Sequence, residues 1–167
     1  MYVEPQEENE CLLVTIGALS NISVKRLKEL GRTHIHPDFD NLINGNDDCL
    51  SHWGAAVWLA RLVNLPVDCI LPLPVSANES FKDEGLTELP EGRGAVTFRI
   101  YTKDGKFQKQ HVCPFKDKLV RDPEFFFIRN DGMRLKDYIR FFSEVDLVIK
   151  PIYAYALPNS ETEEDEL

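Results

Sequence analysis

The feature that most constrains the fold is a pair of alternating segments separated by an Asp-Gly turn. Residues 95–102 (AVTFRIYT) alternate apolar and polar side chains, which predicts a β-strand with one buried face. Residues 103–106 (KDGK) carry the Asp-Gly signal of a type I′ hairpin. Residues 107–115 (FQKQHVCPF) are then predicted to form the returning strand, which Pro114 interrupts. The middle of the chain is therefore expected to form an antiparallel sheet.

Helical patterns come before this hairpin. Residues 11–20 (CLLVTIGALS) are apolar nearly all round, which predicts a buried helix, although the β-branched residues at 14–16 leave a strand open. A second, amphipathic helix is predicted with Ser23 as its N-cap and Gly31 as its C′ residue. A third helix, CLSHWGAAVWLARLVNLP, ends at Pro66.

The rest of the chain completes an α+β pattern. Further strands are predicted at 67–75, 119–123 and 145–157, a helix at 133–144, and loops at 32–48 and 76–94. Helices that precede a sheet of hairpins are typical of an α+β domain, and no Gly-x-Gly-x-x-Gly follows a strand as in a Rossmann fold. We expect one domain over residues 1–157, with N-terminal helices packed on a mostly antiparallel sheet, and an acidic disordered tail at 158–167.

Charge and hydropathy disfavour several classes of partner. The 167 residues carry a formal net charge of −9 and their basic side chains are dispersed, so nucleic acid and anionic membranes are not expected partners. No apolar run approaches the roughly 20 residues of a membrane span. The polar N-terminal segment lacks the apolar region of a secretory signal, which favours a cytoplasmic protein with reduced thiols.

Neither a metal nor a cofactor is expected. The four cysteines are at positions 11, 49, 69 and 113 and form no Cys-x-x-Cys pair, which disfavours a structural zinc site. In the segment HIHPDFD, His34, His36, Asp38 and Asp40 alternate as a metal site on an extended strand would require. The proline and the polar surroundings favour an ordinary loop instead.

Cys11 is the strongest candidate for chemistry. It opens the predicted buried helix, where the helix dipole stabilises a thiolate and lowers the pKa of the thiol. His111 is the candidate base and Asp122 the group that would orient it, because a turn at 116–118 would bring the two to roughly opposed positions of an antiparallel pair. Gln6, five residues before Cys11, could add a side-chain amide to an oxyanion hole.

Another cysteine also opens a predicted helix. Cys49 is followed one turn later by His52, but residues three apart on a helix share one face, so this histidine would lie beside the thiol and not across a cleft. The two aspartates before Cys49 would also raise the pKa of its thiol. Cys69 and Cys113 lie among apolar strand residues and are expected in the core.

These residues resemble a known pattern. A glutamine in the N-terminal loop, a cysteine opening a buried helix, and the later segment HVCPFKDKLVRDPE resemble the papain-like cysteine peptidases, in particular the compact bacteriocin-processing peptidases and related bacterial and phage hydrolases. The similarity covers residues 5–20 and 93–125 best. It implies these roles: an oxyanion-hole donor at Gln6, a nucleophile at Cys11, a base at His111 and an orienting carboxylate at Asp122.

The resemblance implies a cysteine hydrolase, a peptidase or amidase that acts on a peptide or protein through a Cys-His-Asp triad and an acyl-enzyme. The chain departs from the family at Leu12, where the family has glycine, and at Gln110, where it often has glycine. Leu12 could narrow the space for a substrate carbonyl. The alternative is therefore a catalytically inactive papain-like domain with which a phage or bacterium binds a host protein.

Overall fold

The computed structural model describes residues 1–7, 10–44, 49–70 and 86–158, without the side chains of residues 49–53. Its elements, in chain order, are α1 (Cys11–Ser20), α2 (Val24–His34), α3 (Phe39–Ile43), α4 (Cys49–Leu62), the 3-10 turn η1 (Val67–Cys69), β1 (Arg93–Thr102), β2 (Phe107–Lys116), β3 (Leu119–Val120), α5 (Phe126–Asp131), β4 (Met133–Arg134), α6 (Leu135–Ser143) and β5 (Leu147–Ala156). None of the helices in these ranges has the length and apolarity needed to cross a membrane.

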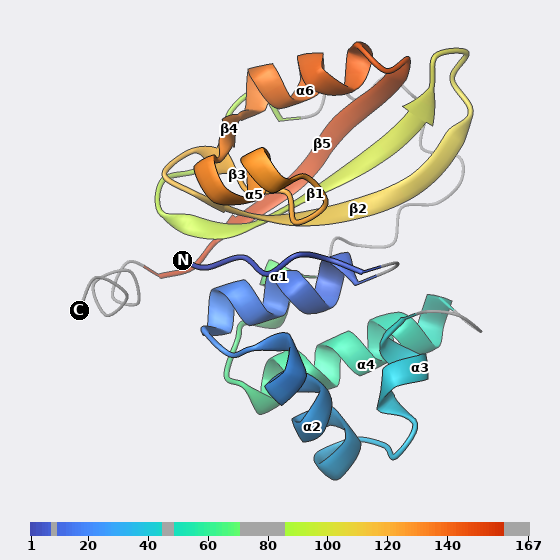
Figure 1. Cartoon of the computed structure of the whole chain (residues 1–167), viewed down its shortest axis with the longest axis vertical. Helices are drawn as coiled ribbons and strands as arrows, with labels where there is room; N and C mark the ends of the chain where they lie inside the picture. Colours follow the sequence, from blue (N-terminus) through green and yellow to red (C-terminus); the bar gives the residue numbers. More distant parts are fainter. Residues whose placement is uncertain (8–9, 45–48, 71–85, 159–167) are drawn as a thin grey trace.

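The fold is α+β, as predicted. The five strands form one sheet in the order β4-β3-β2-β1-β5, and every neighbouring pair is antiparallel. Helices α1 to α4 lie on one side of the sheet, and α5 and α6 lie on the other (Figure 1). Because both faces are covered, β1 is buried along most of its length.

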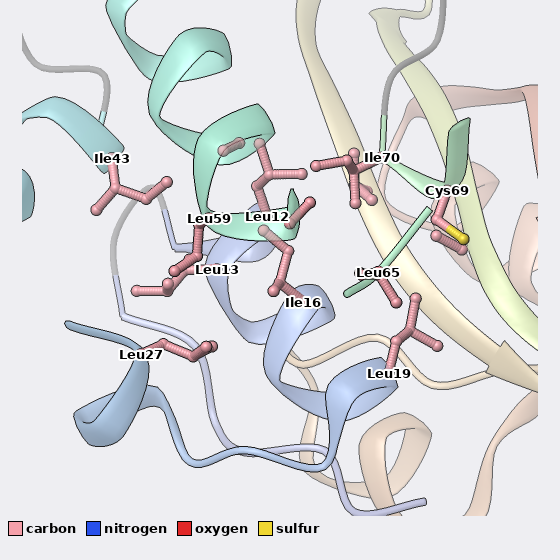
Figure 2. Packing of buried hydrophobic residues seen from close by; sticks show 14 of the residues in the cluster. Leu12, Leu13, Ile16, Leu19, Leu27, Ile43, Leu59, Leu65, Cys69 and Ile70 are labelled. Carbon is pink, nitrogen blue, oxygen red and sulfur yellow. The ribbon is translucent and has the colours of Figure 1, made fainter. Parts of the chain in front are cut away.

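Two apolar cores lie on the two faces of the sheet. The first joins α1, α2, α3 and α4 to the sheet, and Leu12, Leu13 and Ile16 of α1 are at its centre (Figure 2). The second packs α6 against β1 and β2. Alternate residues of β2 take part in different cores, because Val112 belongs to the first and Cys113 to the second. Helix α1 is therefore buried on nearly every side, as its composition predicts.

Both hairpin turns differ from the prediction. In the β1–β2 turn the loop spans residues 103–105, and of its residues only Gly105 has a positive φ, 94°. The N–H of Thr102 donates to the carbonyl of Lys106, so this is a three-residue turn and not type I′. In the β2–β3 turn Asp117 and Lys118 have φ of 53° and 67°, which is the two-residue I′ geometry, where a three-residue turn was expected. Strand β2 also continues through Pro114 to Lys116.

The predicted loop at 32–48 is wrong for much of its described length. Gly31 lies inside α2 and does not end it, since the helix continues to His34. A glycine is needed here because the ring of Phe39 packs where a Cβ would lie, only 2.3 Å away. Residues 39–43 form the short helix α3. The predicted N-cap is correct, since the Ser23 side chain accepts a hydrogen bond from the N–H of Arg26.

Two other predicted strands also change. Residues 67–69, expected to start a strand, form the turn η1, in which the N–H of Cys69 donates to the carbonyl of Pro66. Residues 71–75 of that predicted strand and residues 159–167 of the predicted tail lie outside the described residues. Strand β3 ends at Val120, and the unpredicted helix α5 follows it.

Candidate active site

Cys11 is the first residue of α1 and is partly buried. At this position the backbone N–H has no acceptor within the helix and points out of its N-terminus. The N-cap residue, Glu10, makes no side-chain cap to the helix, and its buried carboxylate pairs instead with Lys28 at 2.7 Å. The Glu10 side chain therefore leaves the N–H groups at the N-terminus of α1 uncapped beside the Cys11 thiol.

His111 and Asp122 form a buried pair. The Nε2 atom of His111 lies 3.1 Å from Oδ1 of Asp122, and the two side chains are 2% and 0% exposed. The expected turn at 116–118 would place the two residues at roughly opposed positions. In the structure they are not directly opposed across the strands. Because the turn has two residues, the pairing of Phe115 with Val120 continues to place Asp122 opposite Cys113, diagonal to His111.

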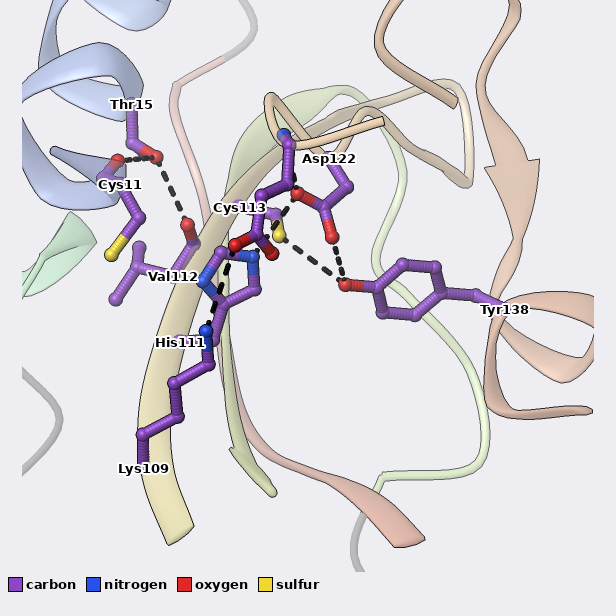
Figure 3. A network of polar contacts seen from close by, with 9 residues as sticks. Cys11, Thr15, Lys109, His111, Val112, Cys113, Asp122 and Tyr138 are labelled. Atoms are coloured by element: carbon purple, nitrogen blue, oxygen red, sulfur yellow. Dashed lines mark hydrogen bonds and ion pairs between the residues drawn. The ribbon is translucent and has the colours of Figure 1, made fainter. Parts of the chain in front are cut away.

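The Asp122 carboxylate is held from three sides (Figure 3). Its Oδ1 accepts the N–H of Glu124 at 2.9 Å in addition to the imidazole, and its Oδ2 accepts the hydroxyl of Tyr138. Burial opposes ionisation, but the charge and hydrogen bond of His111, with the other two donors, lower the pKa of Asp122 below its usual value. A buried carboxylate with these partners stays ionised and fixes the imidazole ring.

The thiol and the imidazole shift one another's pKa in the direction of an ion pair. Burial alone would raise the pKa of Cys11, but the neighbouring imidazole of His111 and the backbone of Val112 lower it below the ordinary value. Burial alone would lower the pKa of His111, but its neighbours Cys113, Asp122 and Cys11 raise it well above the ordinary value. Both shifts favour a thiolate beside an imidazolium.

Cys113 lies against the same histidine but is not activated. It is fully buried, and burial and the nearby Asp122 raise the pKa of its thiol to about 12. It is therefore neutral at physiological pH, and Asp122 and Cys11 supply the negative charge near the imidazole. Donor atoms of His111, Cys113 and Asp122 lie within 4.8 Å of one another, a set that could ligate zinc. The protonated thiol and the bond between His111 and Asp122 favour a proton-transfer network instead.

A pocket of about 340 Å³ opens at the thiol. It is lined by Gln6, Glu7, Cys11, Lys109, Gln110, His111 and Glu124. The N–H of Gln6 donates to the carbonyl of Pro123 at 3.3 Å, which ties the N-terminal segment to the residue after Asp122. The Oε1 atom of Gln6 is buried and has no hydrogen-bond partner among the residues that the structure describes. The structure thus brings the four residues singled out from the sequence to one place.

Leu12 does not enter this pocket. Its side chain is 1% exposed and belongs to the first core, between α1 and α4 (Figure 2). Successive residues of a helix point about 100° apart, so the residue after Cys11 faces the interior while the thiol faces the cleft. The expected narrowing of the substrate space by Leu12 is therefore wrong.

Tyr138 is the residue of the site that the sequence did not reveal. It lies on the apolar face of α6 with Leu135 and Phe142, a spacing that indicates core packing alone. The signal that could have found it is its hydroxyl, since a buried tyrosine needs a polar partner. The other candidate nucleophile, Cys49, opens α4, but its side chain and that of His52 lie outside the described residues.

The HIHPDFD segment has protein partners for its polar groups. Asp40 accepts two hydrogen bonds from Arg32 at 2.9 Å, and Nδ1 of His36 accepts the N–H of Asp38 at 2.9 Å. In the described part of the chain, the one group of three or more potential ligands is the cluster of His111, Cys113 and Asp122. The preference for a non-metal interpretation of HIHPDFD agrees with these contacts.

Comparisons with protein-family models, curated proteins and solved structures found no match to this chain. The resemblance to papain-like peptidases therefore stays a prediction that rests on the residues quoted above. The function is inferred from the geometry of the site.

Proposed function

We propose that this chain is a cysteine hydrolase of the papain-like kind, which cleaves a peptide or related amide bond through an acyl-enzyme at Cys11. The observation that carries the proposal is that the Cys11 thiol lines a pocket together with His111, whose Nε2 atom lies 3.1 Å from the buried carboxylate of Asp122. The lowering of the Cys11 pKa below its ordinary value supports it. Buried cysteines that only fill space have a raised pKa, as Cys113 does. Cys11 has the electrostatic surroundings of a nucleophile.

In the proposed first step, the Cys11 thiolate attacks the carbonyl carbon of the substrate and its oxygen becomes an oxyanion. The Cys11 N–H and the Gln6 amide are the donors for that oxygen, since rotating the amide by about 180° exchanges its oxygen for the NH₂ group at one place. The His111 imidazolium then gives its proton to the leaving amine as the C–N bond breaks. The acyl group remains on the sulfur.

In the second step, neutral His111 takes a proton from water, which attacks the thioester. The tetrahedral intermediate collapses, the carboxylic acid leaves and the thiolate is restored beside the imidazolium. Asp122 keeps Nε2 of His111 engaged at 3.1 Å, which leaves Nδ1 for the sulfur and the substrate. Tyr138 acts through Asp122 and is a positioning residue.

The buried position of Leu12 supports this function over the inactive binding module. The departure from the family pattern at residue 12 was one of two arguments for an inactive site, and the other was the acidic surface of a chain with a formal net charge of −9. Since the Leu12 side chain is in the core and the pocket at the thiol is open, the first argument no longer applies to the described site. The inactive domain remains as one outcome of the experiment below.

The test is the reaction with p-nitrophenyl acetate at pH 6 to 8. We expect a burst of p-nitrophenolate, an acetyl group on Cys11 detected by mass spectrometry of intact protein and peptides, and continued turnover afterwards. Cys11→Ser should lose the burst. Cys49→Ser is the matched control, because it removes another cysteine at a helix N-terminus, and it should keep the burst.

The outcomes separate the two functions. A burst followed by turnover supports a hydrolase. A burst without turnover would indicate a reactive thiol that cannot deacylate and would favour the inactive domain. No acetylation of Cys11, or equal acetylation of Cys11 and Cys49, would contradict the proposal.

A further inference from the structure

The charges around the pocket are not balanced. Glu7 and Glu124 both line it, and Lys109 is the one lysine or arginine among its lining residues. Lys109 lies 3.6 Å from the carboxylate of Glu124, and both side chains are substantially exposed, so this ion pair is weak. Lys109 and Glu124 together contribute no net charge to the pocket.

Glu7 is the remaining carboxylate of the lining; its charge also acts on Lys28, but Lys28 lies outside the lining and pairs with Glu10 at 2.7 Å. Glu7 is exposed, and no ion pair to it is found within the described ranges. It follows Gln6 directly, and Gln6 is anchored to the carbonyl of Pro123. A carboxylate fixed next to the proposed oxyanion donor would lie beside a bound substrate.

The catalytic groups do not offset this charge. The thiolate of Cys11 and the imidazolium of His111 cancel, and Asp122 behind them adds a buried negative charge. The whole chain carries a formal net charge of −9, which adds a long-range field of the same sign. Both the charges at the pocket and the long-range field of the whole chain therefore repel an acidic substrate and attract a basic one.

We infer that the pocket takes a peptide segment with a lysine or arginine side chain beside the scissile bond, and that Glu7 is its charge partner. The inference rests on the proposed function, since it assigns the substrate class of the same site. The substrate cation would pair with Glu7 in a cleft where Lys109 already has Glu124 as its partner.

The test measures the charge preference of the Cys11 thiol with three methanethiosulfonates of similar reactivity: trimethylammonioethyl (cationic), sulfonatoethyl (anionic) and methyl (neutral). Rates are taken at Cys11 by peptide mass spectrometry and divided by the rates of the same reagents with a small neutral thiol, N-acetylcysteine amide. After this division, we expect the cationic reagent to react with Cys11 at least about fivefold faster than the anionic one at low salt. The ratio of these two normalised rates should fall toward one in high salt.

Variants locate the source of the preference. Glu7→Gln should reduce the ratio by about half or more, and Lys109→Gln should increase it because Glu124 is freed. Glu144→Gln changes the net charge by the same amount as Glu7→Gln but lies on the exposed end of α6, so it should leave the ratio nearly unchanged.

The three reagents keep the two proposals apart. If the neutral reagent modifies Cys11 no faster than an ordinary thiol, the proposed function fails and the substrate class with it. If the neutral reagent is fast but the anionic one reacts as well as the cationic one, the substrate class alone is wrong and Lys109 is the dominant charge. Equal effects of Glu7→Gln and Glu144→Gln would overturn the role of Glu7.

Discussion

Removal of the Tyr138 hydroxyl is the sharpest test of the network behind the candidate nucleophile. In Tyr138→Phe the ring is kept, so its contacts with the rings of Phe98 and Phe142, each 5.0 Å between centroids, stay in place. The change removes one of three donors to the fully buried Asp122 carboxylate. A hydrogen bond to a buried charge is worth about 1.5–3 kcal/mol, so we expect the free energy of unfolding to fall by about that amount at pH 7.

The loss should depend on pH. The folded-state pKa of Asp122 is depressed, so its contribution to stability is present above the unfolded pKa of about 3.9 and is lost as pH falls through the folded-state value. The variant lowers the pKa of Asp122 less, because one donor is gone. The difference in stability between wild type and Tyr138→Phe should therefore be largest at neutral pH and should shrink as the pH is lowered below about 4.

Urea unfolding followed by circular dichroism at several pH values measures this difference. Tyr155→Phe, on a partly exposed tyrosine of β5 with no carboxylate partner in the described chain, is the matched control and should change stability by less than about 0.5 kcal/mol. The reasoning would be refuted if Tyr138→Phe and Tyr155→Phe had equal effects, or if the loss at Tyr138 were the same at pH 7 and pH 3.

Three further variants test the site and the helical layer. In His111→Ala the thiol of Cys11 keeps its burial but loses the neighbouring imidazole that lowers its pKa. The rate of alkylation of Cys11 by iodoacetamide at pH 6 should drop by about tenfold for each unit by which the thiol pKa rises. An unchanged rate would contradict the proposed ion pair. Gln6→Ala should weaken the binding of a peptide aldehyde, which forms a hemithioacetal at Cys11, by about a hundredfold, measured by competition with iodoacetamide; unchanged binding would exclude Gln6 as a donor. Gly31→Ala should lower the free energy of unfolding in urea by about 1–3 kcal/mol, since its Cβ would meet an aromatic ring. Its control, Gly54→Ala in α4, has open space around the added Cβ and should raise the free energy of unfolding by up to about 1 kcal/mol. The opposite order would contradict the helix packing.

The sequence was sufficient for what local patterns encode. The alternation of residues 95–102 and 107–115 predicted β1 and β2, and the apolar composition of residues 11–20 predicted α1. The sequence also predicted which residues would form the candidate site, because their order along the chain matches a known pattern. These residues are Gln6, Cys11, His111 and Asp122. Their catalytic roles stay predictions.

What the sequence could not supply depends on contacts between distant residues. Gly31 has the properties of a helix C′ residue, but in the structure it lies inside α2, and its missing side chain makes room for the ring of Phe39. The two-residue turn at Asp117 and Lys118 contains no glycine, so nothing in its composition indicated positive φ at both positions. Tyr138 has the spacing of a core residue, and its bond to Asp122 spans 16 positions of the chain.

The proposed nucleophile and base come from different layers of the fold. Cys11 comes from the helical layer and His111 from the sheet, so their spacing is set by the packing of α1 on β2. Thr15, one turn after Cys11, is fully buried, and its hydroxyl lies 2.7 Å from the Cys11 carbonyl and 3.3 Å from the carbonyl of Val112, the residue after His111. The buried hydroxyl therefore links the backbone of Cys11 to that of Val112, the neighbour of His111. The Cys11 thiol lines the pocket while its supporting helix and strand are held by buried contacts, which is the kind of fixed geometry that the proposed acyl transfer requires.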